Sequence, residues 1–185
     1  DAALDAAARA IAARNQGPVV IPAWRLARTV VVLPVRGTVD LVTLSSLERR
    51  MAEARDLGAD AVVIELDTPG GRADAALDIA DLLKDRTETP ANVVAWVNDQ
   101  ALSAGTIIAL ACREIVVSNN ALMGDAAPIQ VAVGMLRQMA PAERAKIEGP
   151  ILTEVKDSAR RNAWDENLVQ AFVSVGMRLW MLEHT

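Results

Sequence analysis

The sequence contains one cysteine and one histidine, and this scarcity excludes several kinds of site. With Cys112 as its only cysteine, the chain can form neither an internal disulfide nor a cysteine-based metal site. His184 stands next to the last residue, where a catalytic triad or a histidine-ligated metal would depend on a chain end for its geometry. We therefore expect no metal and no cofactor, and a hydrolytic nucleophile in this chain needs a base other than histidine.

Aromatic residues, basic clusters and long apolar runs are also scarce. The aromatic fraction is 3% with no tyrosine, so stacking platforms for nucleic-acid bases or sugars are not expected. The formal net charge is -5 and no basic block occurs, which argues against a nucleic-acid partner. No apolar run reaches the ~18–20 residues needed to cross a bilayer. Aliphatic residues are abundant: 52% of the 185 residues are apolar, enough for one domain with a substantial core.

Apolar runs rich in β-branched residues alternate with helical patterns along the chain. The early patterns predict strands at 29–35, 61–66 and 92–97 and helices at 44–57, 75–83 and 101–111. The later patterns predict a strand at 114–117, helices at 150–162 and 168–172, and a final strand at 177–182. Such alternation at short spacing is typical of right-handed βαβ units with a mainly parallel sheet. We expect residues 1–28 to form a helical arm and an extended lead-in, and residues 29–185 to form a single domain.

The first candidate site is the turn between the strand at 61–66 and the helix that follows it. Its sequence is Asp67-Thr68-Pro69-Gly70-Gly71. Two glycines at a strand-to-helix junction leave backbone N–H groups unobstructed beside a helix N-terminus, which suits an anion or a developing oxyanion. By themselves, the glycines could equally serve only to make the turn.

A second strand-to-helix junction carries Ser103, in the run Leu102-Ser103-Ala104-Gly105. Small neighbours allow a substrate backbone to approach the hydroxyl. The N–H of Ala104 can point to the same place as the N–H of Gly71, and two such donors would form an oxyanion hole. The simpler alternative is that Ser103 only caps its helix, since serine is a preferred cap residue.

Without a usable histidine, the base is expected among the three lysines, Lys84, Lys146 and Lys156. Lys84 and Lys156 lie on charged helical faces, where solvated ion pairs are the expected role. Lys146 stands just before Gly149-Pro150, which is predicted to begin a helix. Burial and a helix N-terminus would both disfavour an ammonium ion there. Lys146 is therefore the candidate base, although taken alone it also fits a surface lysine.

Together these motifs resemble the NfeD-type, Clp-class membrane-associated serine proteases of the ClpP/crotonase superfamily, from about Val30 to Phe172. Residues 66–71 are similar to the family's Asp-x-Pro-Gly-Gly oxyanion loop. Residues 102–105 are similar to its Ala-Ser-Ala-Gly nucleophile motif, with leucine replacing the first alanine. Residues 124–128 resemble its Gly-Ala-x-x-Pro loop, with Asp125 in place of the usual small residue.

The resemblance implies an α/β, ClpP/crotonase-like fold of repeated ββα/βαβ units, with a mainly parallel core sheet flanked by helices. It implies a serine–lysine dyad, in which Lys146 takes the proton of Ser103 during acylation and later activates water. The implied oxyanion donors are Gly71 and Ala104. An unstructured, apolar peptide would lie extended along the residues that the family uses for substrate binding, here Gly70, Gly71, Arg72, Gly124 and Pro128.

The resemblance also implies a context. Family members self-associate, are often continued by membrane spans, and several are linked to stomatin-like membrane proteins. We therefore expect a homo-oligomer that acts on a peptide or membrane protein, with a stomatin-like protein as one candidate. We also expect an extracytoplasmic protease domain of a longer, membrane-associated chain. Trp164, Phe172 and Trp180 could form an interface, although they fit the core equally.

Two alternatives to a protease remain open. The departures from the family motifs at Leu102, Asp125 and Pro150 fit a catalytically inactive scaffold of the same fold. The fold also fits a crotonase-type acyl-CoA enzyme, which would depend on glutamate acid–base residues and a CoA groove, and would not need a serine in this setting.

Overall fold

The computed structural model describes residues 26–85, 87, 89, 92–132, 135–137 and 139–180. Residues 27–179 form one compact unit. The helical arm and extended lead-in expected in residues 1–28 lie almost entirely outside the described residues.

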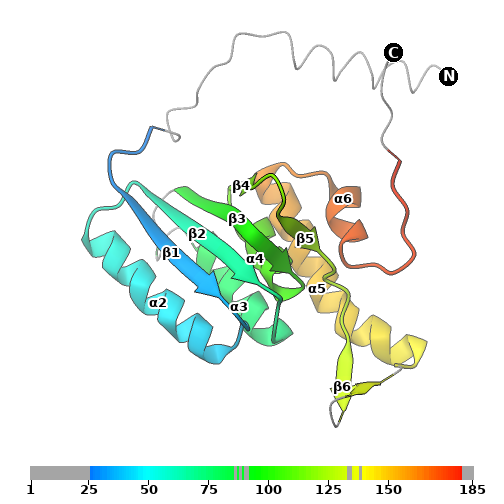
Figure 1. Cartoon of the computed structure of the whole chain (residues 1–185). Helices are drawn as coiled ribbons and strands as arrows, with labels where there is room; N and C mark the ends of the chain where they lie inside the picture. Colours follow the sequence, from blue (N-terminus) through cyan, green and yellow to red (C-terminus); the bar gives the residue numbers. More distant parts are fainter. Residues whose placement is uncertain are drawn as a thin grey trace, which may run out of the picture. The chain divides into compact units, whose positions relative to one another are not determined.

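A five-stranded parallel sheet forms the centre of this unit (Figure 1). Its main path follows chain order through β1 (Val30–Arg36), β2 (Ala61–Thr68), β3 (Asn92–Leu102) and β4 (Glu114–Val117). The short strand β5 (Leu122–Gly124) pairs in parallel with the last residues of β3. The mainly parallel α/β sheet predicted from the sequence is confirmed.

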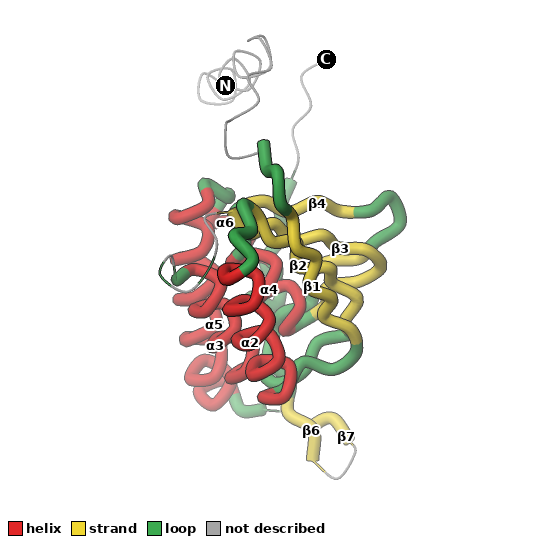
Figure 2. Tube along the Cα trace, turned by 90° about the vertical axis from the view of Figure 1, so that its left-hand side faces the viewer, coloured by secondary structure: helices red, strands yellow, loops and turns green. Residues whose placement is uncertain are grey.

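Helices cover one face of this sheet. Figure 2 shows α2 (Leu41–Asp56), α3 (Ala73–Lys84), α4 (Ala104–Ala111) and α5 (Pro141–Asn162) on the same side of the strands; the short α6 (Glu166–Ala171) follows α5. Alternation along the strands explains this layering: in β1, Leu33 and Val35 are buried, while Val30 and Val32 on the other face are about half exposed. All residues of α4 are buried, so this apolar helix forms the centre of the core.

Two sequence predictions at the end of β3 and at the end of the chain are wrong. The sequence pattern ends this strand at residue 97 and begins a helix at residue 101, but β3 continues to Leu102 and α4 begins at Ala104. The strand is extended by tertiary pairing, because Ala101 pairs with Thr68 of β2 and with Met123 of β5. Residues 177–180 are irregular instead of forming the predicted strand, whose last two residues lie outside the described part of the chain.

The start of α5 also differs from the prediction. The sequence pattern placed Pro150 in the first turn of a helix, whereas α5 begins at Pro141 and contains Pro150 in its interior. Pro141 takes the first-turn position, where proline's missing N–H leaves no hydrogen bond unmade. The segment before α5 forms a small antiparallel pair, β6 (Gln130–Ala132) and β7 (Met135–Arg137). Lys146 therefore lies inside the front part of a long helix and not ahead of one.

Candidate active site

Ser103 lies at the turn between β3 and α4, in a backbone conformation that L-residues rarely adopt. Its φ is 50° and its ψ is -113°, a combination that costs on the order of 1–3 kcal/mol and persists only where the surroundings enforce it. The Ser103 side chain makes no capping hydrogen bond to α4. Ser103 thus occupies the N-cap position of α4 without the capping bond that the simpler interpretation expects, and in the described part of the chain its hydroxyl has no hydrogen-bond partner.

The Gly70-Gly71 turn lies directly against Ser103. A Cβ atom at Gly70 would lie 2.6 Å from the Ser103 Cβ and 3.2 Å from its Oγ, and the φ of Gly70 is +107°. Only glycine fits this approach and this conformation. The hydroxyl of Thr68 fixes the turn, because it accepts a hydrogen bond from the Gly70 N–H (3.1 Å) and donates one to the Gly37 carbonyl (2.5 Å). The two junctions that the sequence singled out separately thus meet in space.

Two backbone N–H groups beside this contact are left without a partner inside the described part of the protein. Gly71 pairs with Val39 in an isolated parallel bridge, in which the Val39 N–H bonds to the Gly70 carbonyl and the Arg72 N–H to the Val39 carbonyl. Because N–H directions alternate along an extended chain, the N–H and C=O of the exposed Gly71 face away from Val39. Ala104 is the first residue of α4, so its N–H has no acceptor within the helix. These are the two donors predicted for an oxyanion hole.

Arg72 is engaged in an ion pair at the start of α3. Its guanidinium meets the Asp74 carboxylate in a two-point contact of 2.6 Å and 3.0 Å, with both side chains more than half exposed. The hydrogen bond from Arg72 lowers the pKa of Asp74 to about 2. The Arg72 guanidinium is therefore held in a charge-compensated pair one residue beyond Gly71.

The loop after β5 completes the surroundings of Ser103. The Gly124 carbonyl accepts the Ser103 N–H at 2.9 Å, and the Ala126 N–H donates to the Phe172 carbonyl at 2.8 Å. Asp125 is exposed and has a φ of 52°, while Pro128 is buried. Gly124 thus lies beside the serine, and the departure from the motif at Asp125 places a carboxylate in the same loop.

Lys146 is exposed, and no hydrogen bond among the described residues joins it to Ser103. The core-facing side of α5 carries Ile151, Val155 and Ala159. At 100° per residue, Lys146 is displaced from Ile151 by about 140° around the helix. Burial of the amine, which the sequence argument assumed, does not occur in this structure.

The other two lysines have different surroundings. The Lys84 ammonium is bound by Glu154 at 2.6 Å and Asp157 at 3.1 Å, in a buried ion network between α3 and α5. Lys156 is half-buried on α5, ten residues beyond Lys146. The solvated ion pairs expected of Lys84 are thus replaced by a buried network, which leaves Lys84 unsuited to the role of a base.

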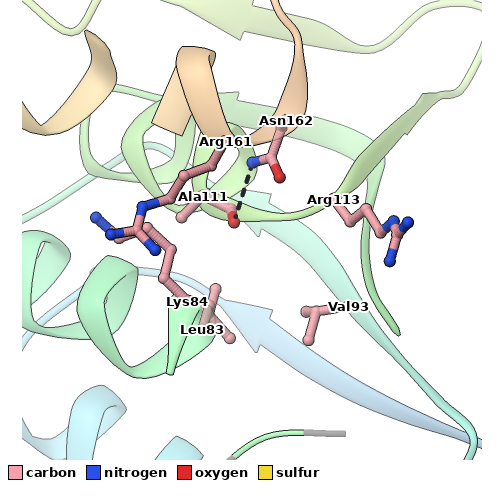
Figure 3. Close-up of a pocket in the computed structure, with 7 residues that line it drawn as sticks. All are labelled: Leu83, Lys84, Val93, Ala111, Arg113, Arg161 and Asn162. Carbon is pink, nitrogen blue, oxygen red and sulfur yellow. Dashed lines mark hydrogen bonds between the residues drawn. The ribbon is translucent and has the colours of Figure 1, made fainter. Parts of the chain in front are cut away.

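A cavity of about 160 Å³ lies near the amino end of β3, beside Val93 (Figure 3). It is lined by Leu83, Lys84, Val93, Ala111, Arg113, Arg161 and Asn162. Val93 stands near the start of β3 and Ser103 just after its end, a separation of about 30 Å at ~3.3 Å per strand residue. This cavity is therefore separate from the serine site, which lies where parallel sheets usually bind ligands, at the carboxyl ends of the strands.

Two buried threonines near the site were not identified from the sequence. Thr68 holds the glycine turn, and Thr106 hydrogen-bonds to Gly124. The sequence does single out Thr106, because it is the only polar side chain in the otherwise apolar, buried helix α4. A buried hydroxyl must find hydrogen-bond partners, and here they are backbone groups of the site.

The parallel sheet and the serine turn facing a Gly-Gly loop define the class of protein: an α/β domain with a ClpP-like fold. Residues 29–184 match the family model of the NfeD1b N-terminal domain, and the chain belongs to this family.

Two curated relatives are membrane proteins. The chain is 36% identical over 138 residues to the membrane protein NfeD1b of Bacillus subtilis, an alignment covering 75% of this chain and 29% of the relative. It is 28% identical over 158 residues to the membrane-bound protease PH1510 of Pyrococcus horikoshii, covering 83% of this chain and 35% of the relative. The chain thus spans about a third of the length of these relatives. In its described part, no helix has the length and apolar character needed to cross a membrane.

Two solved structures of the 1510-N membrane-bound stomatin-specific protease share the fold, each with a TM-score of 0.69. One is a variant in which a serine is replaced by alanine; it is 27% identical and covers 80% of this chain and 71% of that chain. The other is a variant in which a lysine is replaced by alanine, in complex with a substrate peptide; it is 28% identical and covers 79% of this chain and 66% of that chain.

Proposed function

We propose that this chain is the catalytic domain of a membrane-associated serine endopeptidase with Ser103 as its nucleophile. The observation that carries the proposal is the Ser103 turn itself. Its strained backbone holds an unbonded hydroxyl against Gly70, beside two N–H groups that have no partner in the described part of the chain. The description of similar proteins as proteases supports the same conclusion.

In the proposed reaction, Lys146 removes the proton of the Ser103 hydroxyl as Oγ attacks the peptide carbonyl carbon. The N–H groups of Gly71 and Ala104 donate to the oxyanion of the tetrahedral intermediate. The C–N bond then breaks, the leaving amine takes its proton from Lys146, and the acyl group remains on Ser103. Water, deprotonated by Lys146, hydrolyses this ester and regenerates the serine.

The proposal requires the amine of Lys146 to approach Ser103 when substrate binds. Catalytic hydrogen bonds are often loose in free enzymes and tighten only with substrate. The Arg144 guanidinium lies 3.5 Å from the Pro128 carbonyl, which brings the first turn of α5 next to the loop that flanks the serine. The approach of Lys146 to Ser103 thus requires the front of α5 to move, and not the whole domain.

The proposed substrate is an extended, unstructured and apolar peptide segment of a membrane protein, a stomatin-like protein being one candidate. The outward-facing N–H and C=O of Gly71 offer a free strand edge, on which a peptide can add by main-chain hydrogen bonds. Gly70, Arg72, Gly124 and Pro128 would flank it. We further propose that the full protein self-associates, is held at the membrane by segments outside this chain and exposes this domain on the extracytoplasmic side.

Incubation with a fluorophosphonate probe followed by intact-mass spectrometry tests the nucleophile. Wild type is expected to gain one adduct, Ser103→Ala none, and Lys146→Ala an adduct formed at least 100-fold more slowly, because the hydroxyl then lacks its base. Lys156→Ala, the matched lysine control on the same helix, should react like wild type. An adduct that persists in Ser103→Ala would refute the assignment of the nucleophile. Labelling that is lost in Lys156→Ala but not in Lys146→Ala would assign the role of base to Lys156.

The exposure of Lys146 gives one observation in favour of the second candidate, an inactive scaffold of the same fold. That candidate predicts no adduct on wild type at any pH, together with normal folding. It also predicts that Lys146→Ala has no effect on any property of the domain other than surface charge.

A further inference from the structure

Thr106 is a buried polar side chain with an unusual set of partners. Its hydroxyl lies 2.7 Å from the Ala101 carbonyl and 2.7 Å from the Gly124 carbonyl, and it accepts the Gly124 N–H at 2.9 Å. The residue is fully buried in α4, where every other side chain is apolar. The hydroxyl thus joins the end of β3 to Gly124 at the end of β5.

Gly124 connects the Thr106 hydroxyl to the proposed nucleophile, Ser103. The Gly124 carbonyl that faces the Thr106 hydroxyl also accepts the Ser103 N–H at 2.9 Å. On the other side of the serine, the Thr106 N–H donates to the Ser103 carbonyl at 3.0 Å. Both peptide groups that flank Ser103 are therefore fixed by Thr106, one directly and one through Gly124.

Such fixing matters because the backbone of Ser103 is strained. A residue at φ 50° and ψ -113° relaxes to an ordinary conformation unless its neighbours prevent it. Relaxation would turn the Ser103 side chain away from Gly70 and from the Ala104 N–H.

We propose that Thr106 is a positioning residue for the nucleophile: its hydroxyl holds Gly124 in place, and Gly124 holds Ser103 in its reactive conformation. The inference rests on the proposed function, since it concerns the same serine. The proposal requires the hydroxyl group of Thr106, whereas a role in packing alone would require only the shape of its side chain.

The test compares Thr106→Val, which keeps the shape and removes the hydroxyl, with Thr106→Ser, which keeps the hydroxyl and removes a methyl group. The rate of fluorophosphonate labelling per folded molecule should fall at least about ten-fold in Thr106→Val, the effect of one lost hydrogen bond on a barrier. Thr106→Ser should stay within about three-fold of wild type. Val155→Ala, a buried site on α5, controls for lost stability and should label at the wild-type rate per folded molecule.

Amide hydrogen exchange gives a readout that does not depend on activity. In Thr106→Val, the N–H groups of Gly124 and Ser103 should exchange at least about ten-fold faster than in wild type, while Thr106→Ser retains their protection. Equal labelling rates in Thr106→Val and wild type would overturn the proposal.

The two hypotheses can fail separately. If wild type is not labelled at all, the proposed function fails, and the exchange rates alone then decide the positioning role. Unchanged exchange at Ser103 in Thr106→Val would overturn that role, and faster exchange confined to Gly124 and Ser103 would support it.

Discussion

Replacement of Lys84 by methionine is expected to lower the free energy of unfolding by about 3 kcal/mol. The Lys84 side chain is 9% exposed and that of its partner Glu154 is 11% exposed, with Nζ and Oε2 2.6 Å apart. Breaking a buried ion pair from one side typically costs about 3–5 kcal/mol, because a charge is left buried without compensation. Methionine retains the packing of the lysine stem, so the loss is mainly electrostatic.

The partners of Lys84 place the expected value at the low end of this range. Asp157 is 41% exposed and keeps its bond to Arg161 at 2.8 Å, so it remains compensated. Asp81 is 75% exposed and is solvated by water. Among the described residues, Glu154 then retains only the bond from the Ser158 hydroxyl at 2.9 Å. The expected loss of stability therefore arises mainly at the Glu154 carboxylate.

Urea denaturation of a double-mutant cycle measures this cost. Lys84→Met combined with Glu154→Gln should recover most of the stability lost by Lys84→Met alone, because no unpaired charge then remains. Arg49→Met, which breaks an exposed pair with Glu53 at 3.9 Å, is the matched control and should cost less than about 1 kcal/mol. A loss below about 1 kcal/mol in Lys84→Met, or a double variant as unstable as the single one, would refute the reasoning.

The same pair also predicts a pH dependence. Burial lowers the pKa of Lys84, but the hydrogen bond and charge of Glu154 outweigh it, so the pKa is raised above the ordinary value of 10.5. A raised pKa means that the stabilisation is complete below pH 10.5 and is lost as the pH rises through the folded-state value. Unfolding midpoints should therefore fall at strongly alkaline pH in wild type, more steeply than in Lys84→Met.

Two further predictions concern the site and the core. Gly70→Ala should abolish probe labelling, because its Cβ would lie 2.6 Å from the Ser103 Cβ at a φ that alanine rarely adopts; labelling at the wild-type rate would contradict the contact between the two junctions. Cys112 is fully buried and burial raises the pKa of its thiol, so iodoacetamide should alkylate it only after unfolding in urea; rapid alkylation of the native protein would show that the end of α4 is open.

The sheet could be predicted from the sequence because local and tertiary preferences agree there. The run from Ala61 to Leu66 is apolar except for Glu65, as a central parallel strand favours, and its burial matches. The two strand-to-helix junctions were identifiable because small residues gather at each of them, Gly70 and Gly71 at one and Ala104 at the other. Their meeting in space followed from the topology, because the carboxyl ends of neighbouring parallel strands lie side by side.

The parts that could not be predicted depend on contacts distant in sequence. The last residues of β3 have turn-forming character, and only their pairing with β2 and β5 makes them a strand. The role of Thr106 needs Gly124, which follows it by eighteen residues. The start of α5 was misplaced because two prolines, Pro141 and Pro150, compete for the first-turn position and local sequence does not choose between them.

The proline inside α5 has a mechanical consequence. Pro150 has no N–H, so the carbonyl four residues earlier, that of Lys146 itself, lacks its helical hydrogen bond. Gly149 stands beside it, and a Cβ atom at that position would meet nothing within 4 Å. Bending α5 at this point therefore costs less than bending it elsewhere, since one hydrogen bond of the helix is already missing. The candidate base thus stands on the part of α5 before this weakened turn, so a change in the angle of that part would move Lys146 without breaking a further helical hydrogen bond.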